Sequence, residues 1–349
     1  MKLIDRYILR SFASTLAATF VVMIGLYLLL HIFSHVQDMK DAEAAFVKRG
    51  YSLAGGLLRY YLVHIPEMVV FFGPYAVLLA GMYTLYQLNQ NNELVPLFAA
   101  GITRLRVAAP IFGAGAVVAI GLMGLKQEAV PALAREMVFF HGMLKGRSEV
   151  VTSSLPIFQD TRRNVFECDR WDTENRRIDG VWVDAADGRR AHFESLEWTG
   201  DGDEGRWTAL GARSGDAFDP ATETDLVPSD MELEAKTRNR MSFNELRRVT
   251  SRRPDRKDLA VIMHGHIAYA MSPLVLLLLG LPFVMAGRSK SVFSSLGLCL
   301  FLSLAYFTVS LALQRLGAQG EIVNPLLGAW LPIVVFGALG LVFFEAAGL

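Results

Sequence analysis

The side chains that could carry out chemistry in this chain form no known catalytic pattern. The 349 residues contain no GxxxxGK[ST] loop for nucleotide phosphates, no HExxH zinc motif and no GxSxG nucleophile motif. His264 and His266 are two positions apart, so a helix directs them to different sides, and we interpret them as a polar pair at a membrane interface. The sequence therefore predicts no metal site, no cofactor and no catalytic residues.

Charged residues fall into two populations along the chain. The chain has 34 Lys and Arg residues and 34 Asp and Glu residues, so its net charge is zero. It also has no stripe of basic residues, and nucleic acid is therefore not expected as a partner. Residues 126–258 hold 48 of these 68 charges, although 52% of the whole chain is hydrophobic. This distribution indicates a membrane protein with one large polar insertion.

Six apolar runs are long enough to cross a bilayer, which requires about 20 residues per helix. In chain order they are Phe12–Phe33, Ile65–Leu88, Val107–Leu125, His266–Ala286, Val292–Leu313 and Pro325–Phe344. The first is too long for a signal peptide and precedes no small-residue cleavage site, so we expect an uncleaved span. The predicted domains are residues 1–125 with three spans, the insertion at 126–258, and residues 259–349 with three more.

Basic residues in the short loops indicate the orientation. Six spans place both termini on one side of the membrane, and the loops on that side carry seven basic residues against five on the other. By the positive-inside rule both termini then lie in the cytoplasm. The insertion is accordingly expected outside the cytoplasm.

The insertion changes character after Ser153. Short β-favouring stretches alternate with turn signals there; they are residues 164–171, 177–190, 191–198 and 206–216. Asp187-Gly188 suits a hairpin turn. The spacing indicates a β-sandwich, a jelly roll or an open barrel. The expected fold class is an α-helical polytopic membrane protein, with six transmembrane helices in a 3+3 arrangement and an inserted extracytoplasmic all-β, jelly-roll-like domain.

Helices are expected on both sides of the β region. Residues Gln127–Leu144 have a helical pattern. Ser242 is followed three residues later by Glu245, which is the capping-box pattern and predicts that a helix starts there.

The loop between the second and third spans, NQNNELVPLFAAGITRLRVAAP, is too long for a simple hairpin connection. Its polar start can cap a short helix at about residues 91–101, with Glu93 in the first turn, where the helix dipole favours a carboxylate. Gly101 can end that helix. Apolar residues with partial helical spacing follow the cap, namely Leu94, Leu97, Phe98 and Ile102. On the cytoplasmic side they need a cover, either the membrane interface or a partner protein.

Together with several other stretches, this loop resembles the lipopolysaccharide export permease family LptF/LptG, also called YjgP/YjgQ. The matching stretches are IDRYILRSF, PEMVVFFGPYAVLLAGMYTL, NELVPLFAAGITRLRV, MSFNELRR, SPLVLLLLGLPFVMAGRSKS and GAQGEIVNPLLGAWLP. The β block resembles the family's jelly-roll domain in position and length. The IDRY start and the QDM segment favour the G-type branch.

The resemblance implies a non-catalytic permease subunit of an ATP-driven lipopolysaccharide exporter in the bacterial inner membrane. The implied partners are a dimer of the ATPase LptB, a second LptF/LptG-type permease, and LptC- and LptA-type periplasmic proteins that receive lipopolysaccharide from the β domain. The first and fifth spans line the lipid gate in this interpretation. Residues implied to couple the permease to the ATPase are Glu93, at the family's acidic position, with Leu94, Leu97, Phe98, Gly101 and Arg104.

The resemblance also suggests where lipid phosphates bind. G-type members carry lysines at the outer end of the first span, and Lys40 matches one such position, while Ser34 and Asp41 stand where others carry Lys. His31 and His35 lie nearby, so the candidate lipid-binding residues are Lys40, His35 and His31. A simpler role for Lys40 is to anchor the helix at the headgroups.

Two other function classes stay open at this point. One is a polytopic scaffold whose outer domain binds periplasmic proteins without moving lipid. The other is a membrane lipid-modifying enzyme, which requires convergent Asp, Glu or His side chains at the membrane face, a pattern that the sequence does not display.

Overall fold

The computed structural model describes most of the chain. The described residues are 3–48, 50–144, 152–153, 158–160, 162–172, 175–201, 204–213, 218–228, 240–252, 257–285, 292–320 and 322–346. They fold into two compact units. The first unit consists of Met1–Val36, His64–Val130 and Arg256–Leu349, and the second of Gln37–Val63 and Pro131–Asp255. The division of the chain at residues 125 and 258 stays a prediction.

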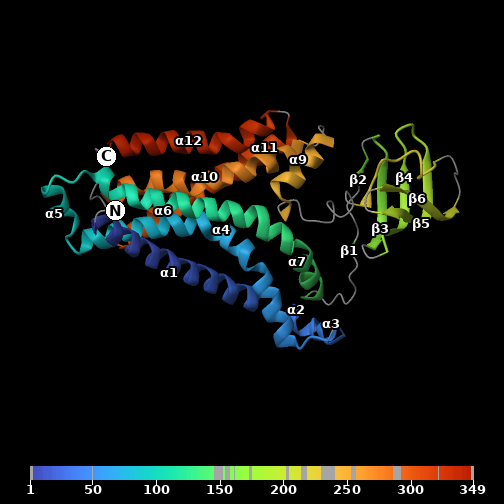
Figure 1. Ribbon diagram of the computed structural model, residues 1–349, viewed down its shortest axis with the longest axis horizontal. Coiled ribbons are helices and arrows are strands. Elements are labelled where there is room, and N and C mark those ends of the chain that lie inside the picture. Colours follow the sequence, from blue (N-terminus) through green and yellow to red (C-terminus); the bar gives the residue numbers. More distant parts are fainter. Residues whose placement is uncertain are drawn as a thin grey trace. The chain divides into compact units, whose positions relative to one another are not determined.

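Six helices in the described part of the chain are long and apolar enough to cross a membrane. They are α1 (Leu3–Ser34), α4 (Leu53–Gln90), the helix Arg104–Ala134 that begins as α6 (Arg104–Gly124), α10 (Lys257–Met285), α11 (Val292–Gln319) and α12 (Pro325–Ala346) (Figure 1). At 1.5 Å per residue each reaches across the hydrocarbon core of a bilayer. The predicted polytopic helical fold with an inserted β region is confirmed.

The core of the first unit lies among α4, α6 and α10. Its large, almost fully buried side chains include Leu78, Met82, Leu85, Ile111, Leu276 and Leu277. Close helix approaches depend on small residues, as is usual in membranes. Between α11 and α12, a Cβ atom at Gly328 would meet the Cα atom of Gly317 at 3.0 Å. Larger residues would separate these helices.

The third span does not end at Leu125 as the sequence suggested. A five-residue π-helix, η1 (Leu125–Ala129), joins α6 directly to α7 (Val130–Leu144). Pro131 follows in α7 and has no N–H to donate to the preceding turn, so regular helical hydrogen bonding is interrupted next to the π-helix. The charged residues of η1 therefore stay inside one continuous helix and do not form a loop.

Part of the second unit is helical. One apolar cluster is shared by four helical segments. They are α2 (Val36–Asp41), α3 (Glu43–Lys48), the first turns of α4, and α7. Its most buried members are Ala42, Phe46, Met137, Phe140, Met143 and Leu144. Helix α9 (Phe243–Arg252) begins with the predicted capping box, because the Ser242 backbone N–H donates to Glu245 Oε2 at 2.8 Å and the Glu245 N–H donates to Ser242 Oγ at 3.2 Å.

The inserted β region is an antiparallel sheet. Its strands are β1 (Thr152–Ser153), β2 (Phe158–Gln159), β3 (Val165–Asp172), β4 (Arg177–Asp184), β5 (Arg190–Asp201) and β6 (Glu204–Arg213). Strands β3 to β6 are joined in succession, while β1 and β2 both pair with β3. One face carries a core in which Trp171 and Trp207 are fully buried, with ring centroids 6.2 Å apart.

The predicted hairpin at Asp187-Gly188 connects β4 to β5. Gly188 has a φ of +88°, a backbone conformation that glycine adopts without strain. The Gly188 N–H donates to the Ala185 carbonyl at 2.9 Å, and the Ala185 N–H donates to the Arg189 carbonyl at 2.8 Å. The local turn signal in the sequence was therefore sufficient.

Candidate functional site

The predicted short helix between the second and third spans is present as α5 (Leu94–Ala99). It lies at the end of the first unit where both chain termini also lie (Figure 1). Gly101 ends it with a φ of +80°. The Gly101 N–H donates to the Phe98 carbonyl at 3.0 Å and the Ile102 N–H donates to the Leu97 carbonyl at 3.1 Å. This is a Schellman motif, as the glycine at this position indicated.

Leu94, Leu97 and Phe98 of α5 face inward. Leu94 is buried with 3% of its surface exposed, and Leu97 and Phe98 pack partly against the core of the first unit. The cover that the sequence required for these three residues is thus supplied by the chain itself. The side that α5 presents outward carries Val95, which is 66% exposed, and Ala99.

Glu93 occupies the N-cap position of α5 with helical angles, φ −83° and ψ −27°, and its carboxylate makes no capping hydrogen bond to the backbone. Instead Glu93 Oε1 accepts hydrogen bonds from the hydroxyl of Tyr7 at 3.1 Å and from Asn91 Nδ2 at 3.3 Å. Tyr7 belongs to the second turn of α1. The acidic residue at the start of α5 is therefore joined to the first span.

A second polar contact joins α1 to the residues that follow α5. Thr103 caps α6, since its hydroxyl accepts a hydrogen bond from the Arg106 N–H at 3.3 Å. The Arg106 guanidinium donates to the Asp5 carboxylate at 2.8 Å. Arg104 lies two residues before Arg106, and its guanidinium carbon is 5.7 Å from the ring centroid of Phe98. The loop thus contacts α1 on both sides of α5.

Helix α1 is buried only near this end. Its buried residues are Asp5, Ile8 and Phe12. Farther along, the ring of Tyr27 lies edge-on to Phe72 of α4 at 5.8 Å. Large apolar residues in the rest of the helix are exposed on this unit, namely Val21, Val22, Leu26, Leu29, Leu30, Ile32 and Phe33. Most of the apolar surface of α1 is therefore available to lipid or to another protein.

The candidate lipid-binding residues lie at the other end of α1. His31 is in its last turn, and the ring of His35 stacks on it with centroids 4.2 Å apart. His35 Nδ1 lies 3.0 Å from the His31 carbonyl oxygen. Lys40 lies in α2, and its side chain is outside the described part of the structure.

The structure also brings together residues that the sequence analysis did not connect. Pro74 lacks an N–H, so the Val70 carbonyl four residues earlier has no partner within α4. The Tyr269 hydroxyl of α10 donates to that carbonyl, and Lys126 Nζ of η1 lies 4.4 Å from the centroid of the Tyr269 ring. The signal in the sequence was the proline, which marks an unsatisfied carbonyl.

His266 is buried within the first unit, and its position relative to the membrane interface stays a prediction. Only 5% of its surface is exposed, because α10 begins at Lys257, nine residues earlier than the histidine. Among the described residues, no group of three or more His, Cys, Asp or Glu side chains is arranged to hold a metal ion.

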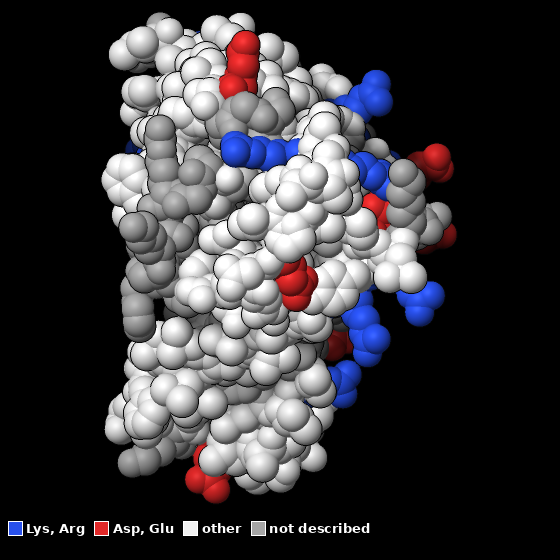
Figure 2. Space-filling model, turned by 90° about the vertical axis from the view of Figure 1, so that its left-hand side faces the viewer, with Lys and Arg blue, Asp and Glu red and all other residues white. Residues whose placement is uncertain are grey.

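Figure 2 shows the face of the molecule that includes the end of the first unit with α5 and the termini. Neutral residues make up most of the visible surface, and Lys and Arg side chains gather along one side of it.

The structure has six helices that are long and apolar enough to span a membrane. A β insertion follows the third of them, and a short helix lies between the second and third. These features define a polytopic membrane protein. Residues 6–346 match the family model described as lipopolysaccharide export system permease LptF/LptG. The chain belongs to this family, as the sequence motifs indicated.

Two relatives share a part of the chain. The lipopolysaccharide export system permease proteins LptG of Escherichia coli K12 and of Escherichia coli O6:H1 are each 33% identical over 105 residues, which is 30% of this chain. The match spans 27% of the length of each relative. Both relatives are of the G type that the sequence favours, and the type of this chain stays a prediction.

Proposed function

We propose that this chain is a transmembrane permease subunit of an ATP-driven transporter of lipopolysaccharide. It extracts the lipid from the bacterial inner membrane and passes it through its periplasmic β domain towards the outer membrane. The observation that carries this proposal is the family match over residues 6–346, since it includes both sets of spans, the α5 loop and the β region.

The energetics of the cargo support the architecture. Exposing each acyl CH2 to water costs about 0.8 kcal/mol, so one chain of about 12 carbons costs roughly 10 kcal/mol. A lipid with several chains therefore needs an apolar path and an external source of energy. Because the sequence contains no P-loop, ATP hydrolysis belongs to a partner subunit in this proposal, and the chain itself is not an enzyme.

The proposed ATPase partner is an LptB-type dimer that docks on the α5 loop in the cytoplasm. Val95, Pro96 and Ala99 form the exposed side of α5, and Glu93, Gly101 and Arg104 flank it. Leu94, Leu97 and Phe98 support the site from inside, since they pack on the core. This differs in detail from direct contact by all six residues, which the resemblance implied.

The other proposed partners are a second LptF/LptG-type permease and LptC- and LptA-type periplasmic proteins. The exposed apolar side of α1 suits the second permease or the lipid itself. Lys40, His35 and His31 are proposed to contact lipid phosphates at the outer end of α1.

Affinity purification from the native membrane in mild detergent tests the proposal, with mass spectrometry of proteins and lipids together. We expect a small soluble ATPase, a second six-span permease and bound lipopolysaccharide. A chain that purifies with envelope proteins and without an ATPase supports the scaffold alternative. Product formation from a lipid by the purified chain alone supports the enzyme alternative.

The variant Glu93→Ala tests the docking site. We expect at least about a tenfold loss of ATP hydrolysis coupled to lipid release, in the range typical of coupling between sites. Val95→Asp places a charge on the exposed side of α5 without touching the core, so we expect less ATPase to co-purify. Glu345→Ala, an exposed carboxylate on α12, is the matched control. A scaffold tolerates all three changes.

A further inference from the structure

Two polar contacts join α1 to the start of α5 and to the first turn of α6, parts of the chain that are far apart in sequence. Tyr7 and Glu93 are separated by 86 positions, and Asp5 and Arg106 by 101. One contact lies immediately before α5 and the other shortly after it. We call these four residues, Asp5, Tyr7, Glu93 and Arg106, the α1 anchor.

The Asp5–Arg106 pair is the more buried part of the α1 anchor, whereas Tyr7 and Glu93 form their hydrogen bond at the surface. The Asp5 side chain is 12% exposed, and it accepts a charge-assisted hydrogen bond from Arg106 at 2.8 Å, the kind of bond that is short and directional. Ile8 and Phe12, one and two turns farther along the same helix, are almost fully buried in the core. Close packing of Ile8 and Phe12 therefore holds this end of α1, and the directional hydrogen bond of Asp5 adds to it.

The rest of α1 is not held in this way. Its apolar residues from Val21 onward are largely exposed on the first unit. A small rotation of the end that is held moves the far end of this 32-residue helix by a larger distance. That far end carries the stacked pair His31 and His35.

We propose that Asp5 and Tyr7 are positioning residues that transmit movement of α5 to α1. When the partner ATPase displaces α5, Glu93 at the start of α5 and Arg106 in the first turn of α6 transmit the displacement to the cytoplasmic end of α1. The inference rests on the proposed function, because it requires an ATPase on α5 and a lipid along α1. It assigns to Tyr7, Asp5 and Arg106 a role in coupling that is distinct from docking.

The test uses the intact complex of this chain with its ATPase and second permease, reconstituted in proteoliposomes that contain lipopolysaccharide. ATP hydrolysis and release of lipopolysaccharide to a periplasmic acceptor are measured in parallel. The variants are Tyr7→Phe, which removes one hydroxyl, Asp5→Asn, Arg106→Gln, and the exchange Asp5→Arg with Arg106→Asp. The matched controls are Tyr83→Phe, since Tyr83 is similarly exposed at 44% against 49% for Tyr7, and Arg10→Gln on the exposed side of α1.

For the three single variants we expect normal assembly and continued ATP hydrolysis, with at least about a fivefold loss of lipopolysaccharide released per ATP. The exchange variant restores the ion pair in reverse and is expected to recover most of that ratio compared with Asp5→Asn. A role in folding alone would lower the yield of the complex and leave the ratio unchanged. If a charge variant fails to assemble, Tyr7→Phe and the exchange variant decide the question.

The outcomes separate the two proposals. If the wild-type complex releases lipopolysaccharide and all anchor variants keep the ratio of the controls, the α1 anchor has no coupling role and only this inference is wrong. If the wild-type chain binds no ATPase or releases no lipopolysaccharide, the proposed function is wrong, and the inference is overturned with it.

Discussion

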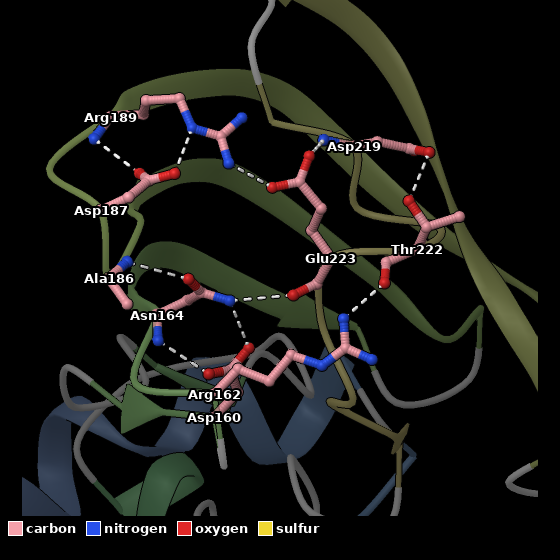
Figure 3. Close-up of polar contacts among 9 residues, drawn as sticks. All are labelled: Asp160, Arg162, Asn164, Ala186, Asp187, Arg189, Asp219, Thr222 and Glu223. Atoms are coloured by element: carbon pink, nitrogen blue, oxygen red, sulfur yellow. Dashed lines mark hydrogen bonds and ion pairs between the residues drawn. The ribbon is translucent and has the colours of Figure 1, made fainter.

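Two regions of the molecule differ in how many polar side chains join them to residues distant in sequence. One is helix α1, and the other is the segment of residues 219–226 in the β domain. The described side-chain hydrogen bonds of α1 with the start of α5 and the first turn of α6 are the two of the α1 anchor. The segment 219–226 takes part in a connected set of hydrogen bonds and ion pairs among nine residues (Figure 3). A few contacts at one end permit a helix to move as a lever, whereas a connected network fixes a segment in place.

Asn164 is the centre of the β-domain network. Its backbone N–H and Nδ2 donate to the two carboxylate oxygens of Asp160 at 2.7 and 2.8 Å. Nδ2 also donates to the Glu223 carbonyl at 3.0 Å, and Oδ1 accepts from the Ala186 N–H at 3.0 Å. One amide side chain thus links the start of β3, the β4–β5 turn and the segment 219–226, as Figure 3 shows.

A second layer of ion pairs lies nearer to the solvent. Arg189 donates from Nε to Asp187 at 2.6 Å and from Nη2 to Glu223 at 2.5 Å. The other Glu223 oxygen accepts from the Asp219 N–H at 3.1 Å. Exposed ion pairs contribute little individually, so the buried amide network is expected to account for most of the stability here.

The largest expected effect is therefore on the buried network. Asn164→Ala removes the partners of the Ala186 N–H and the Glu223 carbonyl and leaves the Asp160 carboxylate, which is 4% exposed, with fewer donors. Each unsatisfied buried group costs about 1–3 kcal/mol, so we expect a loss of about 3 kcal/mol or more in the free energy of unfolding. Four of the five tryptophans lie in the β domain, so denaturation of the intact protein followed by tryptophan fluorescence measures it.

Asn175→Ala is the control for that variant, because Asn175 bonds to Asp172 in an exposed turn. We expect a change of less than about 0.5 kcal/mol there. Equal losses for both variants would mean that the network does not lock the segment, and the contrast with α1 would disappear.

A smaller effect is expected where the helical unit depends on a single hydrogen bond. Tyr269→Phe removes the hydroxyl that satisfies the Val70 carbonyl, which Pro74 leaves without a helical partner. An unsatisfied buried carbonyl costs about 1–3 kcal/mol. We expect a lower thermal unfolding temperature in detergent, with Tyr83→Phe as the control. An unchanged unfolding temperature would show that another group reaches the carbonyl.

Local signals in the sequence were sufficient for many elements of the fold. Apolar length predicted the spans, Ser242 with Glu245 predicted the start of α9, Asp187-Gly188 predicted the β4–β5 turn, and Gly101 predicted the end of α5. Each of these features depends on residues within a few positions of one another, where backbone geometry and hydrogen bonding restrict the possibilities.

The contacts of the candidate site could not be predicted in the same way. The partners of Glu93 and Arg106 lie 86 and 101 positions away, and nothing in their own neighbourhoods selects Tyr7 or Asp5. The inward side of α5 was also undetermined, because a six-residue helix with apolar residues on several sides has no clear period. Only packing decides that Leu94 is buried and Val95 exposed.

The smallest expected effect concerns the outer ion pairs of the β domain. The backbone N–H of Arg189, and then its guanidinium, hold the pKa of Asp187 below its ordinary value of 3.8. Because the folded-state pKa is the lower one, this contribution to stability is fully present above the unfolded-state pKa and disappears as the pH falls through the folded-state value. Asp187→Asn should therefore lower the denaturation midpoint slightly at pH 7, with a difference that shrinks below pH 3.8. Glu204→Gln, on an exposed strand end, is the control. A difference that stays constant into strong acid would show that the charge of Asp187 contributes nothing and that the outer ion pairs do not add to the network around Asn164.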